Sequence, residues 1–461
     1  MVTQGTTVPS MVGGSPQDAE AALVIRWVGP VSDGPATVLG PGVTVLGRDP
    51  ECTGCLPSAE SSRRHAEIRW AGCVPMLRDL DSMNGVFLNQ RRVTQAPLRA
   101  RDVLRLGDWV GVLALAPRHD PAAWVFEELI PGYWAGPSLL AALAPARRVA
   151  ASDLPIVIEG ETGAGKEGAA RAVHAWSGRA GRFVGLNCAA LPETLAEAEL
   201  FGYRKGAFTG ADRTSPGHLR GAHAGTLLLD EIADLPLPVQ AKLLRAVEER
   251  EVLPLGESGP ASVDVRLLAA TQGPLRRAVE EKRFRGDLFA RLDGFHLAIP
   301  PLRERAEEIP FLFRRLIETH GGGARPPRLD PLLIERLCVY EWPFNVRELT
   351  LLARRLVALH PSAELLESAM WVQPAGGGGR VQSPGTRGAG APAADDVGRA
   401  TQGVDPETFA AALRENQGNV KQTAAALGIS RGRAYRLIQQ LDSLDLDGIR
   451  GQTPVRPTRG N

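Results

Sequence analysis

The first part of the chain is a series of short apolar runs that alternate with turn residues. Runs such as ALVIRWV, VTVLG and GVFLN follow one another from about residue 22 to residue 117, with Gly, Pro, Asn and Asp between them. Short strands at this spacing are typical of antiparallel sandwiches. We therefore expect an all-β sandwich over residues 22–117.

From residue 137 to residue 373 the pattern changes. Helical stretches alternate with short apolar strands such as PIVI and TLLL. This alternation predicts a parallel α/β sheet. Residues 118–136, which carry Pro, Gly and a few aromatic residues, are interpreted as a connector that packs on one of its neighbours.

The C-terminal part divides into a spacer and a small helical module. Residues 374–403 are rich in Gly, Ala and Pro without a periodic apolar face, which predicts a flexible linker. Residues 405–446 predict an all-α module in which two short helices flank a Gly-Ile-Ser turn, and residues 447–461 form a basic tail. The chain is thus predicted to be multidomain, with all-β, α/β and all-α parts.

Composition narrows the class of protein. The 461 residues suffice for two to four domains, and a net charge of +1 gives no overall attraction to nucleic acid or membrane. Five scattered cysteines fit a reducing cytosol, and Cys52 and Cys55 lack the second pair that a zinc site needs. Neither a secretory signal nor a run of membrane-spanning length is visible, so we expect a cytoplasmic protein without a membrane partner.

The candidate chemistry centres on a strand, a glycine-rich loop and a helix. The apolar run Ile156–Ile158 precedes GETGAGK, whose glycines let backbone amides converge on phosphate oxygens. The helix N-terminus and Lys166 add positive charge. A glycine-rich turn without a ligand is the alternative. The residues expected to bind ATP are Gly160, Glu161, Thr162, Gly163, Ala164, Gly165, Lys166 and Glu167.

Two further motifs follow the loop. The apolar run Thr226–Leu229 ends in Asp230 and Glu231, which would place one acid on Mg²⁺ and the other on the attacking water. Acids at a strand end also cap helices, but the preceding phosphate loop favours a nucleotide site. Between the two lies a sequence with no evident role in a core, predicted to be a mobile loop: Gly206, Ala207, Phe208, Thr209, Gly210 and Ala211.

The central domain resembles the sigma-54 activator family, the bacterial enhancer-binding proteins. GETGAGKE, ELFGYRKGAFTGA, GTLLLDEI, FRGDLFARL and WPFNVREL occur in the family's order. The resemblance implies an AAA+ ATPase that uses ATP and Mg²⁺, has a helical lid from about residue 302 and assembles as a ring, with a hexamer expected. It also implies that the GAFTGA loop contacts sigma-54 RNA polymerase holoenzyme and drives closed promoter complexes open.

The same resemblance assigns roles to single residues. Lys166 and the amides of Gly160–Gly165 would hold phosphates, Asp230 would bind Mg²⁺ and Glu231 would activate water. Asn187 would pair with Glu231 and link nucleotide state to loop position. Two arginine fingers that reach a neighbouring subunit's nucleotide, and a sensor arginine of the lid, are expected at Arg285, Arg291 and Arg347.

Three positions depart from the family's pattern. Ala164 replaces the usual Thr, Gln272 replaces a sensor Asn, and Phe344 replaces the Gly of WPGN. Glu167 is normal for the family. Since no departure removes a catalytic group, we expect an active ATPase whose coupling Gln272 and Phe344 could alter.

The N-terminal domain resembles a forkhead-associated (FHA) domain. Its anchors are Gly-Arg at residues 47–48, Ser-Arg-Arg-His at 62–65 and Asn-Gly at 84–85. The resemblance implies binding of a phosphothreonine-containing protein, such as a Ser/Thr kinase, since an Arg with a hydroxyl and amides can hold phosphate. A sandwich whose anchors are only turn residues is the alternative, and Met83 departs from the usual Thr. The expected ligand residues are Arg48, Ser62, Arg63 and Asn84.

The C-terminal module resembles the Fis-type helix-turn-helix of the same activator family. The segment GNVKQTAAALGISRGRAYRLIQQL carries this resemblance, which implies binding of double-stranded DNA by the second helix. A basic surface helix without a ligand is the alternative. The candidates for base or phosphate contacts are Ser430, Arg431, Arg433 and Arg436.

Together these features predict an ATP-driven, DNA-bound activator of sigma-54 polymerase with phosphothreonine input. A second hypothesis is a DNA-binding phosphopeptide adaptor or repressor whose ATPase no longer remodels sigma-54. An AAA+ chaperone or helicase would not explain a GAFTGA loop together with a helix-turn-helix.

Overall fold

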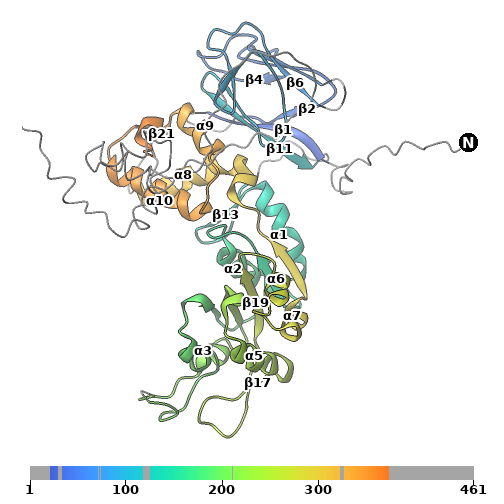
Figure 1. The fold of residues 1–461 in the computed structure, drawn as a ribbon. Helices are drawn as coiled ribbons and strands as arrows, with labels where there is room; N and C mark the ends of the chain where they lie inside the picture. The colour runs from blue at the N-terminus through green and yellow to red at the C-terminus, as the bar shows by residue number, and fades with distance from the viewer. Residues whose placement is uncertain are drawn as a thin grey trace, which may run out of the picture. The chain divides into compact units, whose positions relative to one another are not determined.

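Alternating side chains build the N-terminal sandwich. In the computed structural model, which describes residues 21–29, 34–70, 72, 74–117, 125–209, 211–321 and 326–372, the prediction of an all-β sandwich is confirmed (Figure 1). One sheet has the order β2 (Thr37–Leu39), β1 (Ala21–Val28), β11 (Trp109–Pro117), β10 (Val103–Leu106), β7 (Val86–Leu88), β8 (Arg91–Val93). The other has the order β4 (Gly54–Cys55), β3 (Gly42–Gly47), β5 (Ala66–Trp70), β6 (Met76–Asp79), β9 (Gln95–Pro97).

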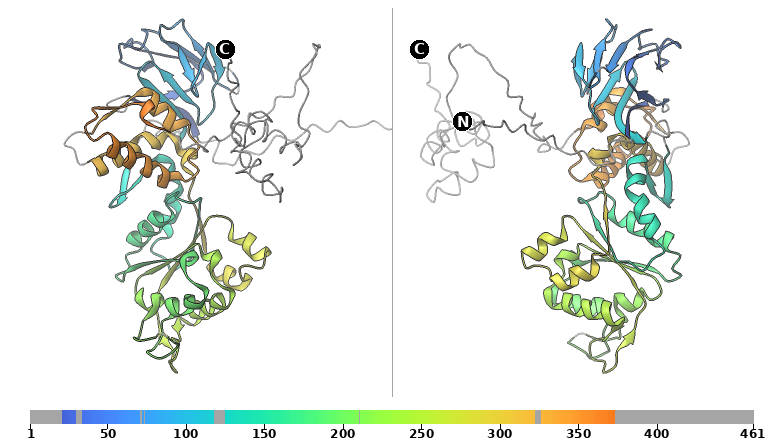
Figure 2. Two further views of the ribbon diagram at one scale, coloured as in Figure 1. Left: turned by 60° about the vertical axis from the view of Figure 1, so that its left-hand side comes forward. Right: turned by 90° about the vertical axis from the view of Figure 1, so that its right-hand side faces the viewer.

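The central domain is a parallel sheet between helices, as predicted. Its strand order is β15 (Phe183–Asn187), β16 (Thr226–Asp230), β19 (Arg266–Thr271), β14 (Ile156–Glu159), β20 (Phe295–Ala298). The helices are α1 (Pro137–Val149), α2 (Lys166–Ser177), α3 (Glu193–Phe201), α4 (Gly217–Gly221), α5 (Leu237–Glu249), α6 (Leu275–Glu280) and α7 (Gly286–Leu292). Figure 2 shows helices on both sides of this sheet.

The three inner strands β14, β16 and β19 are buried on both faces because helices cover both faces of the sheet. Val157 and Leu229 pack in a cluster with side chains of α3, α5 and α7. Ile158 and Leu228 pack in the opposite cluster with side chains of α1 and α2. Burial on two sides explains why these strands are continuous apolar runs.

The lid follows the sheet in the chain. It consists of the 3₁₀ segment η4 (Leu302–Glu308) and the helices α8 (Ile309–Gly321), α9 (Pro331–Val339) and α10 (Asn345–Leu359), with β21 (Arg328–Leu329), β22 (Leu365–Leu366) and η5 (Ser368–Met370). Its core contains Phe313, Trp342 and Leu349, each fully buried.

The predicted connector is more structured than its turn residues indicated. Strands β12 (Glu127–Ile130) and β13 (Tyr133–Ala135) form an antiparallel hairpin there. The hairpin packs against α2, the helix that follows the glycine-rich loop. This part of the connector therefore belongs physically to the α/β core.

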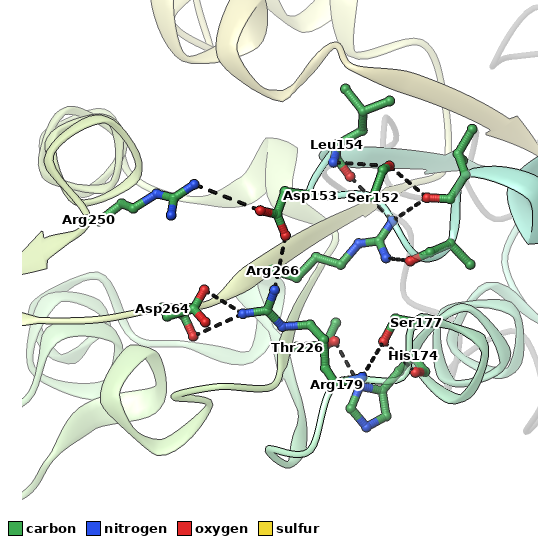
Figure 3. Close-up of polar contacts among 12 residues, drawn as sticks. Ser152, Asp153, Leu154, His174, Ser177, Arg179, Thr226, Arg250, Asp264 and Arg266 are labelled. Atoms are coloured by element: carbon green, nitrogen blue, oxygen red, sulfur yellow. Dashed lines mark hydrogen bonds and ion pairs between the residues drawn. The ribbon is translucent and has the colours of Figure 1, made fainter.

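A polar network ties together the edge of the sheet where its strands begin. Figure 3 shows Arg179, which follows α2, between Asp153 and Asp264, with nitrogen–oxygen distances of 3.1 and 2.5 Å. The buried Arg266 donates to the carbonyl of Ala150 at the end of α1. These contacts hold the starts of the strands together. The motif residues follow the other ends of the same strands.

Candidate nucleotide and phosphopeptide sites

The glycine-rich loop forms at the end of β14, and Lys166 is its first helical residue. The Lys166 side chain is 7% exposed. Its Nζ donates to the carbonyl of Gly160 at 2.9 Å and lies 3.3 Å from Oε1 of Glu231. The cation therefore bridges the loop and the acid at the end of β16.

Close contact with the lid explains one glycine of the loop. Gly163 has a φ of +75°, and a Cβ there would lie 2.3 Å from the carbonyl oxygen of Phe344. A side chain at this position would therefore be strained and would collide with the lid. Val346 donates its amide to the Gly163 carbonyl at 3.0 Å, so loop and lid are joined at this point.

The lid holds the loop through side chains as well. Both guanidinium nitrogens of Arg303 that face Glu161 lie within 2.8 Å of its carboxylate, which lowers the pKa of Glu161. The buried Asn345 donates to Glu161 at 3.2 Å and to the carbonyl of Thr162 at 3.1 Å. A shift of the lid would therefore move the phosphate-binding loop.

The two acids of the second motif lie at the end of β16, next to the loop. Burial and then the charge of Glu231 raise the pKa of Asp230. Glu231 has a φ of +52°, a left-handed conformation that turns its side chain toward Lys166. Such strain at a non-glycine residue is often found at functional sites.

The amide that reaches Glu231 differs from the one expected. Gln272 Nε2 donates to Glu231 Oε1 at 3.0 Å. The Oδ1 of Asn187 instead accepts the amide of Ala189 at 3.0 Å and caps the short helix after β15. The expected pairing of Asn187 with Glu231 is thus not the contact seen here, although both residues line the same cavity.

These residues surround a cavity of about 710 Å³. Its walls come from the loop, the ends of β15 and β16, the β12–β13 hairpin and the lid, and the sensor candidate Arg347 lies among them. The volume is in the range of pockets that bind nucleotide-sized ligands. The loop, strand-end acids and lid arginine that were predicted separately are therefore brought together around one cavity.

Sequence reasoning missed the hairpin wall of this cavity. The ring of Tyr133 packs on α2, where a Cβ on Gly168 would lie 2.5 Å from ring atoms. Burial raises the pKa of Tyr133 to about 12, so the hydroxyl stays protonated. The signal available in the sequence was the aromatic pair Tyr-Trp placed before α1, together with a glycine soon after the loop lysine.

The two candidate arginine fingers lie away from this cavity. Arg285 directly precedes α7, and its guanidinium lies 2.7 Å from the carboxylate of Asp287. Arg291 lies near the end of the same helix, where it lines a separate cavity at the edge of the sheet where the strands begin. Neither arginine lines the wall of its own chain's nucleotide cavity.

The GAFTGA segment is a turn, and Gly210 lies outside the described residues. The amide of Gly206 donates to the carbonyl of Ala211 at 2.9 Å and closes the turn. The ring of Phe208 packs edge-on against Tyr203, with centroids 5.0 Å apart. Phe208 and Thr209 thus sit at the tip of a closed loop.

The sandwich brings its four predicted ligand residues to one end. Backbone hydrogen bonds join Arg48 to Ser62 at 3.0 Å and Asp49 to Arg63 at 3.1 Å. Ser62 Oγ accepts the amide of Met83 at 3.2 Å, next to Asn84. The side chains of Arg48, Arg63 and Asn84 are exposed there, so a phosphate could reach them.

His65 holds these loops together from inside the sandwich. Its Nδ1 accepts the amide of Ser62 at 3.1 Å, so Nε2 is the nitrogen that donates to the carbonyl of Gly85, also at 3.1 Å. Burial lowers the pKa of His65 and favours this neutral form. These contacts brace the two loops that carry Ser62 and Asn84.

Several predictions concern residues that the structure does not describe. The linker at 374–403 and the DNA-contact candidates Ser430, Arg431, Arg433 and Arg436 lie outside the described residues. Within the described ranges the cysteines are free and no group of three His, Cys, Asp or Glu side chains could hold a metal. None of the helices in this part of the chain combines the length and apolarity that crossing a bilayer requires.

Comparison with known proteins identifies all three described domains. The family model "Sigma-54 interaction domain" matches residues 135–298, "AAA+ ATPase lid domain" matches residues 303–372, and "FHA domain" matches residues 44–107. These assignments agree with the α/β core, the lid and the sandwich.

Curated relatives match over about two thirds of the chain. NtrC of Azospirillum brasilense is 37% identical over 66% of this chain and 68% of its own length. ZraR of Klebsiella oxytoca is 42% identical over 64% of this chain and 65% of its own length. Across the first relatives matched, the chain spans about half to two thirds of their length. With this identity and coverage, the chain belongs to the family of sigma-54-dependent transcriptional regulators.

Proposed function

We propose that the chain is an ATP-hydrolysing activator that remodels sigma-54 RNA polymerase from closed to open promoter complexes. The observation that carries this proposal is the grouping of Lys166, Asp230 and Glu231 around one cavity whose wall includes the lid. Glu231, held by Lys166 and Gln272, would act as general base on the attacking water. The GAFTGA turn would transmit the result to sigma-54.

Magnesium fits the acids at the end of β16. Mg²⁺ in such sites is bound by one or two carboxylates together with substrate phosphates and waters, so a full cage of protein ligands is not required. Asp230 would hold the ion, whose charge would offset the burial and the neighbouring Glu231 that raise the pKa of Asp230. When bound, the ion would neutralise charge that develops on the phosphates.

The proposal includes a ring and a DNA anchor. Arg285 and Arg291 would serve the nucleotide of a neighbouring subunit, which requires a head-to-tail interface that closes, with a hexamer as the expected form. The residues at 405–446 would bind double-stranded DNA near the promoter, and the linker at 374–403 would let the ring reach polymerase.

Phosphothreonine recognition by the sandwich would be the input signal. Arg48 and Ser62 would hold the phosphate, Arg63 would assist, and Asn84 would bind the peptide backbone. We expect Arg48→Ala to abolish binding of a phosphothreonine peptide while basal ATP hydrolysis stays within about twofold, because the two sites share no residue. Unchanged peptide affinity in fluorescence anisotropy would refute the assignment.

The test of the main proposal is promoter opening by purified protein. The full chain, sigma-54 holoenzyme and a double-stranded promoter are mixed with ATP, and strand separation is followed by permanganate footprinting. We expect opening with wild-type protein and none with Lys166→Ala. ATP hydrolysis without opening, even with phosphopeptide present, would instead favour the adaptor or repressor.

A further inference from the structure

The outer face of the six-stranded sheet is apolar where an exposed face would be polar. On β11, Trp109 and Leu113 point into the sandwich core, while Val110 and Val112 point to the other side. β10 repeats this alternation with Leu104 inside and Val103 outside. Antiparallel sheets with one solvated face normally carry polar residues on it, so these valines indicate a covered face.

Strand register gathers these side chains into one patch. Val28, Val110, Arg105 and Phe87 are direct neighbours across β1, β11, β10 and β7. Val112 and Val103 form the next row. We call these six residues the outer patch.

The lid covers the outer patch. The four valines are at most 3% exposed, and they belong to the same buried cluster as Ile309, Leu333, Ile334 and Leu337 of the lid. Helix α9 contacts β10 and β11, and the segment η4 contacts β11. Burial of apolar surface stabilises a fold by about 25 cal/mol per Å², so covering these four valines contributes favourably to the free energy of the contact.

One buried carboxylate fixes the position of the lid on this patch. Glu335 of α9 is 2% exposed, and its Oε2 accepts Nε of Arg105 at 2.7 Å. Its Oε1 accepts the amide of Gln90 at 2.8 Å. The Arg105 guanidinium also lies 3.9 Å from the centre of the Phe87 ring. A buried charge with both oxygens satisfied defines one register, because a displaced lid would leave it unpaired.

The lid also reaches the phosphate-binding loop. Asn345 and Arg303 contact Thr162 and Glu161 there, as described above. The lid thus contacts the sandwich through α9 and η4, and the phosphate-binding loop through η4 and the start of α10. None of the predicted phosphopeptide residues belongs to the outer patch, so peptide binding and docking can be altered independently.

We propose that the outer patch is an intramolecular docking surface for α9, anchored by Glu335, and that the sandwich controls ATP hydrolysis through the lid. The docking rests only on the contacts above. The control of hydrolysis rests in addition on the proposed ATPase function. Release of α9 from the patch would free the lid, and with it the loop that holds the phosphates.

Hydrogen–deuterium exchange of the full chain tests the docking without any need for activity. Val112→Lys places a charge in the patch, and we expect the backbone amides of α9 that follow Pro331 to exchange at least tenfold faster. Val43→Lys is the matched control, since Val43 is half-exposed on the other sheet, and it should leave α9 unchanged. Glu335→Gln removes the buried charge on the lid that pairs with Arg105, and it should accelerate exchange in β10 and β11.

The outcomes separate docking from control. Unchanged α9 exchange in Val112→Lys together with unchanged β10 and β11 exchange in Glu335→Gln would overturn the docking. If Val112→Lys also speeds exchange in β3 and β5, the substitution has unfolded the sandwich itself. The exchange of β10 and β11 in Glu335→Gln then decides whether α9 docks on the patch. The control claim expects a change of at least threefold in ATP turnover in Glu335→Gln but not in Val43→Lys. If Glu335→Gln speeds exchange in β10 and β11 but hydrolyses ATP at the wild-type rate, the control claim is overturned and the docking claim stands.

Discussion

At the residue scale, the nucleotide site depends on the contacts that position the carboxylate of Glu231. Oε1 of this acid lies within 3.3 Å of both Lys166 Nζ and Gln272 Nε2, which fixes the carboxylate at the end of β16. The longer side chain of Gln272, a departure from the family's Asn, is the one that makes this contact. Its effect on hydrolysis can therefore be tested directly.

We expect Gln272→Leu to lower kcat for ATP hydrolysis by about tenfold with little change in nucleotide affinity, since the base loses one of its two positioning contacts. Gln272→Asn is the graded control. Its kcat should lie between those of wild type and Gln272→Leu, because the Asn side chain keeps the amide but is one methylene shorter. Phosphate release and binding of a fluorescent ATP analogue would be measured in parallel. Equal turnover in all three proteins would show that the contact does not position Glu231.

A second residue-scale prediction concerns pH. Burial, and then the charge of Glu308, raise the pKa of Glu307 to about 7. Arg305, Glu308 and the Ser138 hydroxyl face it. Because the folded-state pKa lies above the unfolded value, the protonated form stabilises the fold at low pH, and that stability is lost as pH rises through about 7.

Glu307→Gln should therefore be more stable than wild type at pH 8.5 by on the order of 1–3 kcal/mol, and nearly equal at pH 5. The substitution keeps a hydrogen-bonding amide beside Ser138 and removes the titration. Thermal unfolding between pH 5 and pH 8.5 measures the difference. Melting curves that shift in parallel across this range would contradict the assignment.

At the element scale, the sequence predicted the strands that carry motifs but not all the elements that enclose them. β14 and β16 were predicted because each is a short apolar run that ends in a phosphate loop or a pair of acids. The β12–β13 hairpin was interpreted as part of a connector, since Pro and Gly there mark turns and its strands are short. Arg303 and Glu161 are 142 positions apart in the sequence, so their ion pair could not be predicted from local sequence patterns.

The hairpin also gives an element-scale prediction. Gly168→Leu should weaken nucleotide binding by about tenfold, because its side chain would collide with Tyr133 and displace β13 from the cavity wall. Tyr133→Ala in the same chain should recover most of the affinity by opening that space. Titration with a fluorescent ATP analogue measures both, and Gly221→Ala, in open space at the end of α4, controls for a general glycine effect. A double variant no better than Gly168→Leu would contradict the steric explanation.

At the scale of the whole molecule, the account depends on a shared active site. Arg285 and Arg291 lie outside the cavity of their own chain, so their proposed role requires a neighbour. The ring and the sigma-54 contact are predictions from motifs, because both involve other chains. The C-terminal module is also a prediction, because it lies outside the described residues.

Mixing variants tests the shared site. Lys166→Ala and Arg291→Ala should each hydrolyse ATP at least about a hundredfold more slowly than wild type. Mixed rings would contain interfaces with an intact lysine on one side and an intact arginine on the other, so part of the activity should return. Steady-state phosphate release at a fixed total protein concentration measures this, with Arg283→Ala as an exposed-arginine control. Activity equal to the average of the two separate variants would place Arg291 outside the neighbour's site.

The most direct test of the central claim follows ATP hydrolysis and promoter opening in the same tubes for wild type and Thr209→Ala. Thr209 lies in the GAFTGA turn and outside the nucleotide cavity. The account predicts that wild-type protein opens the promoter, whereas Thr209→Ala hydrolyses ATP within about twofold of the wild-type rate and opens none. Promoter opening by Thr209→Ala at the wild-type rate would contradict the claim that this loop couples hydrolysis to sigma-54.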